Sequence, residues 1–217
     1  MLFVGRLRKH QKKDGPSIVR FYGMTIEQTT FEIPGKVIND QKGMDYKPDP
    51  DMNDIAVHCL IRTSGAHAKE ILKYEDDFKR NHANVTENKV KEYKKLLRIA
   101  TIEELSKHDV IFCTTSMATS PRLLDAVRNN VFQLIIDECG MCTEPECISS
   151  IITTKPKQVV LIGDHMQLRP IIMCKQAAEL GLDKSLFERY YKTGKVVQLD
   201  MQYRMVRMFT LIEIDAI

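Results

Sequence analysis

Two acidic residues follow an apolar run near the middle of the chain. Val131–Ile136 reads VFQLII and is followed at once by Asp137 and Glu138. A carboxylate at the tip of a strand can hold Mg²⁺ through the water shell that this ion keeps. A second carboxylate beside it can orient and deprotonate the water that attacks in phosphoryl transfer. Asp137 fits the first role and Glu138 the second.

A second apolar run ends in a different set of polar groups. Gln158–Ile162 reads QVVLI and is followed by Gly163, Asp164 and, three residues later, Gln167. The amide of a glutamine in this place can hydrogen-bond a terminal phosphate oxygen, and so report whether ATP or ADP is bound. A polar turn closed by Pro170 explains the same residues without a ligand. Because they follow a strand, as Asp137 and Glu138 do, we favour the functional interpretation.

The segment between the two runs must place both polar tips at one edge of a sheet. Thr143, with Glu146 three residues later, is a capping box that predicts a helix. Strand, helix and strand in this order are typical of a parallel βαβ unit, whose strand ends meet at the edge where α/β proteins bind nucleotides. Strands and helices alternate from Ile99 onward, which predicts an α/β fold with a parallel sheet.

Turn and cap residues predict the other elements. Ser120 followed by Pro121 is a helix start, and Pro34-Gly35 is a turn after a weakly alternating segment, Thr25–Ile33. Strands are predicted at Ser17–Tyr22, Asp109–Cys113, Val131–Ile136, Gln158–Ile162 and Val196–Leu199. Helices are predicted at Ile55–Arg62, from a cap at Ser64 to Phe78, from a cap at Thr86 to Leu97, from a capping box at Thr101, at Pro121–Arg128, after Thr143 and at Lys184–Lys192.

The two helices between residues 64 and 98 are rich in Lys and Glu and predict a helical hairpin outside the sheet. A solvated hairpin is the simpler interpretation. Contact with nucleic acid is the alternative, and it would use the lysines of the second helix. These are Lys89, Lys91, Lys94 and Lys95.

The composition is that of an ordinary globular chain. With 217 residues, 43% hydrophobic and 28% charged, the chain can bury a core, and its net charge of +3 does not by itself indicate nucleic acid. No apolar run approaches the about 18 residues of a membrane span, and no signal peptide is visible. The six cysteines are typical of reduced thiols rather than a disulfide framework. We therefore expect no membrane segment and an intracellular location, cytoplasmic or nuclear.

Five motifs occur in order along the second half of the chain. They are DECG at 137–140, TEPEC at 143–147, LIGDHMQLRP at 161–170, KSLFERY at 184–190 and QYRM at 202–205. This set resembles superfamily 1 helicases of the Upf-like group, strongly over about Ile99–Met205 and more weakly from Ser17 to Arg98. The resemblance implies an incomplete RecA-like P-loop NTPase domain at 1–205, with 64–98 as a helical-hairpin insertion. Residues 206–217 match nothing in that group.

The resemblance also implies roles for the matched residues. Asp137 and Glu138 correspond to the Walker B pair that handles Mg²⁺ and water. Gly163, Asp164 and Gln167 correspond to the motif that couples the γ-phosphate to nucleic acid. Tyr203 would stack on the adenine, and Arg204 would contact the γ-phosphate, where a fixed guanidinium can neutralise developing charge. Thr114, Thr115 and Ser116 correspond to a loop that touches the nucleic-acid backbone, which gives affinity without sequence readout.

One motif of such motors is not in the sequence. Nowhere do the 217 residues contain G-x-x-x-x-G-K-[ST], the loop that cradles phosphates. The function that we expect is an ATP-dependent helicase, or nucleic-acid-stimulated ATPase, that uses ATP and Mg²⁺ on single-stranded RNA or DNA. We expect this chain to represent part of its first motor domain, to be monomeric, to bind ATP poorly by itself, and to meet RNA-decay or ribonucleoprotein partners.

Two alternatives remain open. A catalytically inactive, truncated paralogue could act as an RNA-binding or partner-binding module through the hairpin lysines, the basic amino end and the Thr114–Ser116 loop. Cys139, Cys142 and Cys147 have a spacing that could bind zinc, but no second C-x-x-C or H-x₃₋₅-H follows to complete a tetrahedral site. Packed thiols are therefore the simpler interpretation of these cysteines.

Overall fold

The structure, a computed structural model, describes residues 15–31, 33, 50–80, 85–194 and 196–199. The chain divides into two compact units, which are described one at a time. The first unit contains the described residues up to Asp137 together with Glu144–Leu161. The second unit contains Glu138–Thr143 and the described residues from Ile162 onward.

The first unit contains two parallel strand pairs. β1 (Ile18–Arg20) pairs with β2 (Val110–Phe112), and β3 (Gln133–Ile136) pairs with β4 (Gln158–Leu161). Both pairs are parallel, as predicted for this α/β chain. Among the described residues, hydrogen bonds join the four strands into two two-stranded sheets.

A helix provides the crossover between the strands of the second pair. α9 (Glu144–Thr154) begins after the turn that follows β3 and ends four residues before β4. It buries Cys147, Ser150 and Thr154. This strand–helix–strand order is the βαβ unit that the capping residues predicted.

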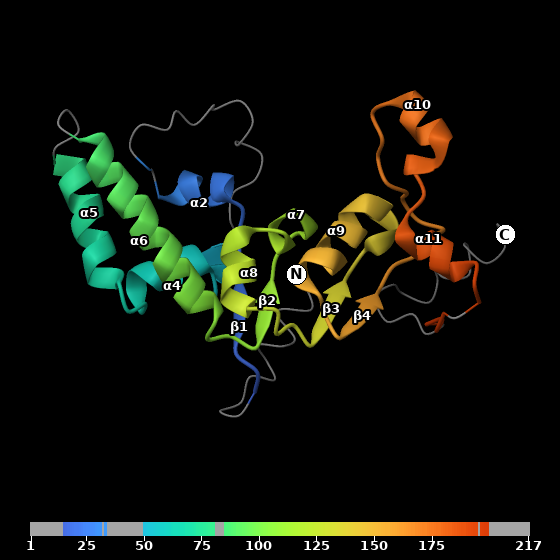
Figure 1. The fold of residues 1–217 in the computed structure, drawn as a ribbon, viewed down its shortest axis with the longest axis horizontal. Helices are drawn as coiled ribbons and strands as arrows, with labels where there is room; N and C mark the ends of the chain where they lie inside the picture. Colours follow the sequence, from blue (N-terminus) through green and yellow to red (C-terminus); the bar gives the residue numbers. More distant parts are fainter. Residues whose placement is uncertain (1–14, 32, 34–49, 81–84, 195, 200–217) are drawn as a thin grey trace, which may run out of the picture. The chain divides into compact units, whose positions relative to one another are not determined.

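Three helices of the first unit form the helical hairpin and its base. α4 (Val57–Thr63) leads into α5 (Ala68–Arg80), and α6 (Glu87–Leu105) lies beside α5 in Figure 1. α6 starts at the predicted cap, because the Thr86 hydroxyl accepts a hydrogen bond from the Lys89 N–H at 3.5 Å. Ile71 and Phe78, two turns apart on α5, are buried, so one face of this helix packs inward.

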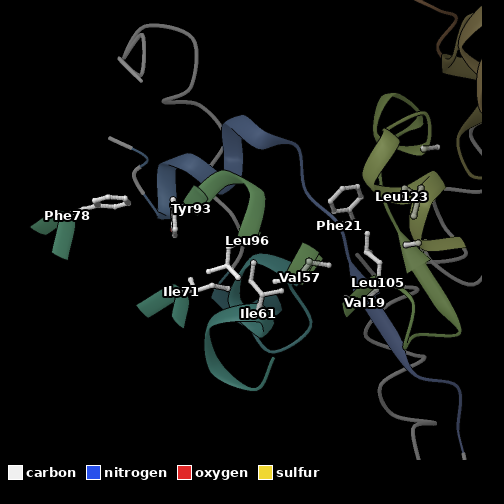
Figure 2. Packing of buried hydrophobic residues seen from close by; sticks show 13 residues of the cluster. Val19, Phe21, Val57, Ile61, Ile71, Phe78, Tyr93, Leu96, Leu105 and Leu123 are labelled. Atoms are coloured by element: carbon white, nitrogen blue, oxygen red, sulfur yellow. The ribbon is translucent and has the colours of Figure 1, made fainter. Parts of the chain in front are cut away.

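One hydrophobic cluster joins the hairpin base to the β1–β2 pair. Figure 2 shows its buried side chains, which come from β1 and from α4, α5, α6 and α8 (Pro121–Val127). At about 25 cal/mol per Å² of apolar area removed from water, such a cluster is the main stabilising feature of the unit. Its largest fully buried members are Tyr93, Phe21, Ile71, Leu105, Val19 and Val57.

The remaining elements of the first unit are short. α2 (Met24–Thr30) follows β1, and α7 (Thr115–Ala118) follows β2. A single 3₁₀ turn, η1, spans Pro50–Met52.

The second unit consists of short helical segments. They are η3 (Cys139–Met141), α10 (Lys175–Ala177), the π-helical η4 (Ala178–Leu182) and α11 (Leu186–Tyr191). α11 packs against η3. The Ser185 hydroxyl caps α11 by accepting from the Glu188 N–H at 3.1 Å.

The weakly alternating segment Thr25–Ile33, for which the sequence predicts no helix or strand, overlaps the helix α2. Three local expectations are wrong. Ser64 ends α4 rather than starting α5, since its N–H bonds to the Leu60 carbonyl. Thr101 is buried inside a continuous α6 and starts no helix. Val196–Leu199 is no strand, and Val197 and Leu199 are highly exposed.

No helix among the described residues is both long enough and apolar enough to span a membrane.

Candidate functional site

Asp137 lies directly after β3, at the end of the parallel pair. The register pairs Ile136 with Leu161 as the last residues of both strands, so β3 and β4 end at the same edge of their sheet. The Asp137 side chain is exposed there. An exposed carboxylate at a strand tip is a hard oxygen donor that can meet hydrated Mg²⁺, so this residue fits the metal that the motif implies.

Glu138, the first residue of the second unit, has a left-handed backbone conformation. Its φ of 52° and ψ of 36° are costly for a side chain with a Cβ, by roughly 1–2 kcal/mol. The residue is exposed and begins the η3 turn. Backbone strain of this kind concentrates at functional sites, where the surrounding structure maintains it.

In the second unit the turn after β3 packs on the turn after β4. The Cys139 N–H donates to the Ile162 carbonyl at 2.9 Å. A Cβ on Gly163 would lie 2.9 Å from the Gly140 nitrogen, and one on Gly140 would lie 2.8 Å from the Asp164 carbonyl oxygen. Only glycine fits at both positions without moving backbone. The two motifs therefore meet through their main chains.

Asp164 organises the loop that follows β4. Its Oδ1 accepts from the Met166 N–H at 2.9 Å, and its Oδ2 accepts from the Gln167 Nε2 at 2.9 Å. A side-chain amide has two N–H donors, so Gln167 keeps one for another acceptor, such as a phosphate oxygen. The exposed Gln167 amide is thus oriented but still available.

An aromatic contact holds the same loop against the second unit's last helix. The rings of His165 and Tyr191 lie 3.7 Å apart between centroids at an angle of 30°. Tyr191 ends α11, and Glu188 one turn earlier pairs with Lys192 at 3.0 Å. The hydrogen bond from Lys192 is the main reason why the pKa of Glu188 is lowered. A charged, capped helix thus supports the loop.

Thr114–Ser116, expected to form a loop, lies in the first unit after β2, where Thr114 is the cap of α7 and Thr115 and Ser116 begin this helix. The Thr114 hydroxyl caps α7 by accepting from the Met117 N–H at 3.3 Å. The Thr115 carbonyl accepts from the Ser150 hydroxyl of α9 at 3.2 Å, which fixes this helix start to the βαβ unit. Thr114 and Ser116 are exposed. Both hydroxyls can still donate to a phosphate oxygen.

The adenine and γ-phosphate residues expected in QYRM, Tyr203 and Arg204, lie outside the described residues. So does the predicted tail at 206–217. Their roles remain predictions.

The zinc-binding alternative for the cysteines receives no support in the described ranges. There, no group of three or more His, Cys, Asp or Glu side chains is placed to hold a metal ion. Cys139 and Cys147 are buried, and Cys142 is half-buried.

A cavity in the first unit was not predicted from the sequence. Its volume is about 400 Å³, and it is lined by residues of α2, α4, α6 and α7 and by the first residues of α8. His58 lies in its wall and is only 1% exposed. No spacing or composition signal marks these residues, because the fold alone brings them together.

Comparison with known proteins gives the same family as the motifs. Residues 7–175 match the family described as AAA domain. The ATP-dependent helicase NAM7 of Saccharomyces cerevisiae is 38% identical over 156 residues, which are 71% of this chain and 15% of that protein.

Two further relatives match over longer stretches of the chain. Regulator of nonsense transcripts 1 of Caenorhabditis elegans is 39% identical over 203 residues, 93% of this chain and 17% of that protein. The mouse protein named 3'-5' exoribonuclease HELZ2 is 36% identical over 193 residues, 86% of this chain and 6% of that protein. The chain thus spans only 6–17% of the length of these three relatives. With the family match and the five motifs, these similarities show that the chain belongs to the AAA-domain family and, within it, to the Upf-like helicases of superfamily 1.

Proposed function

We propose that the chain is the Mg²⁺-, water- and strand-handling part of an ATP-dependent helicase motor that acts on single-stranded RNA or DNA. The observation that supports this most is the parallel β3–β4 pair, whose strands end together with Asp137 directly after β3. Two of the relatives are named as an ATP-dependent helicase and as a regulator of nonsense transcripts. RNA is therefore the first substrate to test.

In this proposal the acidic residues handle the metal and the water. Asp137 would hold Mg²⁺ through its water shell, and the bound metal would neutralise charge on the phosphates. Glu138 would orient the attacking water and accept its proton. Gly163 has no side chain, and the tight packing that this allows would bring the Asp164–Gln167 loop up to the γ-phosphate.

Gln167 would report the nucleotide state. Its amide is fixed by Asp164 through one N–H, and the second N–H would donate to the γ-phosphate of ATP. Loss of that phosphate would release the contact. Tyr203 and Arg204 would add adenine stacking and γ-phosphate neutralisation.

The single-stranded nucleic acid would bind through its sugar-phosphate backbone. Thr114, Thr115 and Ser116 offer hydroxyl and N–H donors that suit phosphate oxygens, which gives affinity without sequence preference. Partners in RNA decay follow from the names of the relatives and belong to the same proposal, as do a monomeric chain and a cytoplasmic or nuclear location.

The sequence has no G-x-x-x-x-G-K-[ST] loop, so the 217 residues alone would bind ATP weakly. This same observation favours a second candidate, a catalytically inactive module that binds RNA or a partner. The two differ in whether Glu138 still activates water.

An ATPase assay separates them. Purified chain is given millimolar ATP, Mg²⁺ and saturating single-stranded RNA, and Glu138→Gln is the matched control because it keeps size and removes the base. If the chain is part of a motor, its ATP turnover should be well below about 1 s⁻¹, the lower end for ordinary enzymes. Glu138→Gln should lower that turnover further, by about 10²-fold or more, because a general base contributes at least this much to the rate. Identical ATPase rates in the chain and in Glu138→Gln would contradict the motor proposal and support the catalytically inactive module. Rates of about 1 s⁻¹ or more would contradict weak ATP binding.

A further inference from the structure

The cavity of the first unit contains buried polar groups without partners. Among the described residues, neither ring nitrogen of His58 has a hydrogen-bond partner, although the residue is only 1% exposed. The Gln28 Nε2, which belongs to a second lining residue, is also buried and has no partner there. Buried polar groups without partners cost free energy, and such groups in a cavity wall are available to a molecule that enters it.

The His58 ring presents one donor and one acceptor. Burial, and then the positive charge of Arg62, lower its pKa to about 4, so the imidazole is neutral at physiological pH. A neutral imidazole has one N–H and one lone pair in the same plane. Gln28 adds an N–H donor. This set suits a neutral, planar molecule that offers both acceptors and donors at its edge.

The rest of the wall is mostly apolar and partly aromatic. Phe31 lies in it, with its ring edge-to-face to His58 at 5.9 Å between centroids. Met117 and Leu97 also line the cavity. A volume of about 400 Å³ falls within the about 300–1,000 Å³ of small-ligand sites. The cavity therefore has room for a flat ring system with polar edges.

Two exposed cations line the cavity, in addition to Arg62 and Arg122, which are paired with Glu75 and Glu27. Lys94 and Arg98 line it from successive turns of α6, and both are exposed. Arg98 also pairs with Asp125 at 2.7 Å. Among the described residues of the wall, the carboxylate of Glu27 is paired with Arg122 at 3.2 Å, so it leaves no isolated negative charge. This arrangement suits a ligand that has a neutral ring inside and an anionic group outside.

We propose that this cavity takes one base of a bound single strand of RNA or DNA, with the attached phosphate at Lys94 and Arg98. Its wall is continuous with the Thr114–Ser116 segment, because Met117 follows Ser116 on α7 and lines the cavity. A strand of nucleic acid whose backbone lies on this helix start can therefore turn one base into the cavity. The inference rests on strand binding in the proposed function and adds a base-binding site to it.

The test compares two strands of equal charge. A ten-nucleotide adenosine RNA and an abasic strand of the same length are titrated into the 217-residue chain by fluorescence anisotropy. The base-bearing strand is expected to bind about tenfold more tightly, the worth of one stacked and hydrogen-bonded base. Gln28→Met, which keeps volume and removes the donor, and His58→Leu are expected to lower its affinity toward that of the abasic strand. Neither variant should change binding of the abasic strand.

A lysine variant tests the phosphate contact, and a second lysine variant is its control. Lys94→Ala should weaken both strands, while Lys73→Ala, an exposed lysine of α5 outside the cavity wall, should change neither. Melting temperatures show whether each variant is folded. If His58→Leu does not fold, Gln28→Met decides alone.

Several results would overturn the inference. Equal affinities for the two strands would contradict the base site while leaving strand binding intact. The same conclusion would follow if the chain prefers the base-bearing strand and Gln28→Met keeps that preference unchanged. Binding of free AMP without binding of either strand would make the cavity a mononucleotide site and remove the strand from it. Absence of all binding would overturn both this inference and the proposed function.

Discussion

The Arg62 guanidinium on α4 donates from Nε to the Glu75 carboxylate on α5 across 2.7 Å. The Tyr93 hydroxyl of α6 donates to the same Glu75 oxygen at 2.6 Å, so one carboxylate joins three helices. Arg62 is 7% and Glu75 12% exposed, and burial is the main reason why the pKa of Tyr93 is raised. A shared, buried acceptor of this kind fixes how the hairpin meets its base.

Glu75→Gln should therefore destabilise the chain markedly. It leaves the buried Arg62 cation without its counter-charge, a loss of about 3 kcal/mol in the free energy of unfolding. The matched control is Asp77→Asn, which breaks the exposed pair of Asp77 and Lys89 at 2.8 Å on the same hairpin. Urea unfolding should show almost no change for the control. Equal effects of the two substitutions would mean that the buried network does not fix the hairpin.

His58 should make stability depend on pH. Its pKa is lowered from the usual 6.5 to about 4, first by burial and then by Arg62. Between these values the unfolded chain binds a proton that the folded chain does not, so stability is full above about pH 6.5 and falls as the pH drops toward 4. The loss is at most about 3 kcal/mol.

Thermal unfolding at pH 7 and pH 4.5 checks this prediction. The chain should lose more stability over that interval than His58→Leu, which has no group to titrate at that position. Parallel curves for the two proteins would show that His58 is not responsible.

Gly163 should tolerate no side chain. The Cβ of Gly163→Ala would lie 2.9 Å from the Gly140 backbone nitrogen, and the clash forces the two turns apart at a cost of about 1–3 kcal/mol. Gly23→Ala is the control, because a Cβ there meets only the Met117 sulfur at 3.9 Å. Differential scanning calorimetry should resolve the difference. A variant as stable as the control would contradict the close packing of the two motifs.

The strain at Glu138 should come from its left-handed backbone conformation and not from its side-chain charge. Asn adopts the left-handed region more easily than Gln, so Glu138→Asn should be more stable than Glu138→Gln by about 0.5–1 kcal/mol. Both substitutions remove the carboxylate, so they should abolish water activation equally. Greater stability of Glu138→Gln, measured by urea unfolding, would show that the turn holds no such strain.

Most elements of the fold follow from local signals in the sequence. Thr86 and Pro121 mark helix starts that the structure confirms, and the apolar runs become β3 and β4. Thr101 shows where local signals fail. Its capping-box pattern is real, but Ala100 and Leu105 are buried on either side of it, so packing continues α6 through it. Ser64 is a similar case: it was predicted to cap the start of α5, but α4 extends up to it and it ends that helix instead.

The predicted motif residues and the cavity differ in how far the sequence predicts them. Asp137, Glu138 and Gln167 are predicted through motifs, because their order and spacing are visible along the chain. The cavity is not, since Gln28 and His58 are 30 residues apart on α2 and α4 and share no motif. Tertiary packing alone makes their polar atoms part of one wall.

We expect this chain to bind single-stranded nucleic acid through phosphate contacts at Thr114–Ser116, where α7 begins after β2. The decisive measurement is the dissociation constant of a ten-nucleotide RNA between 50 and 200 mM salt, for the chain, for Ser116→Ala and for Ser149→Ala, an exposed serine on α9. The logarithm of the binding constant should fall linearly with the logarithm of the salt concentration, by about 0.7 for each phosphate contacted. Ser116→Ala should bind a few-fold more weakly and Ser149→Ala as the chain does. No binding at the lowest salt, or affinity that salt does not change, would contradict the claim.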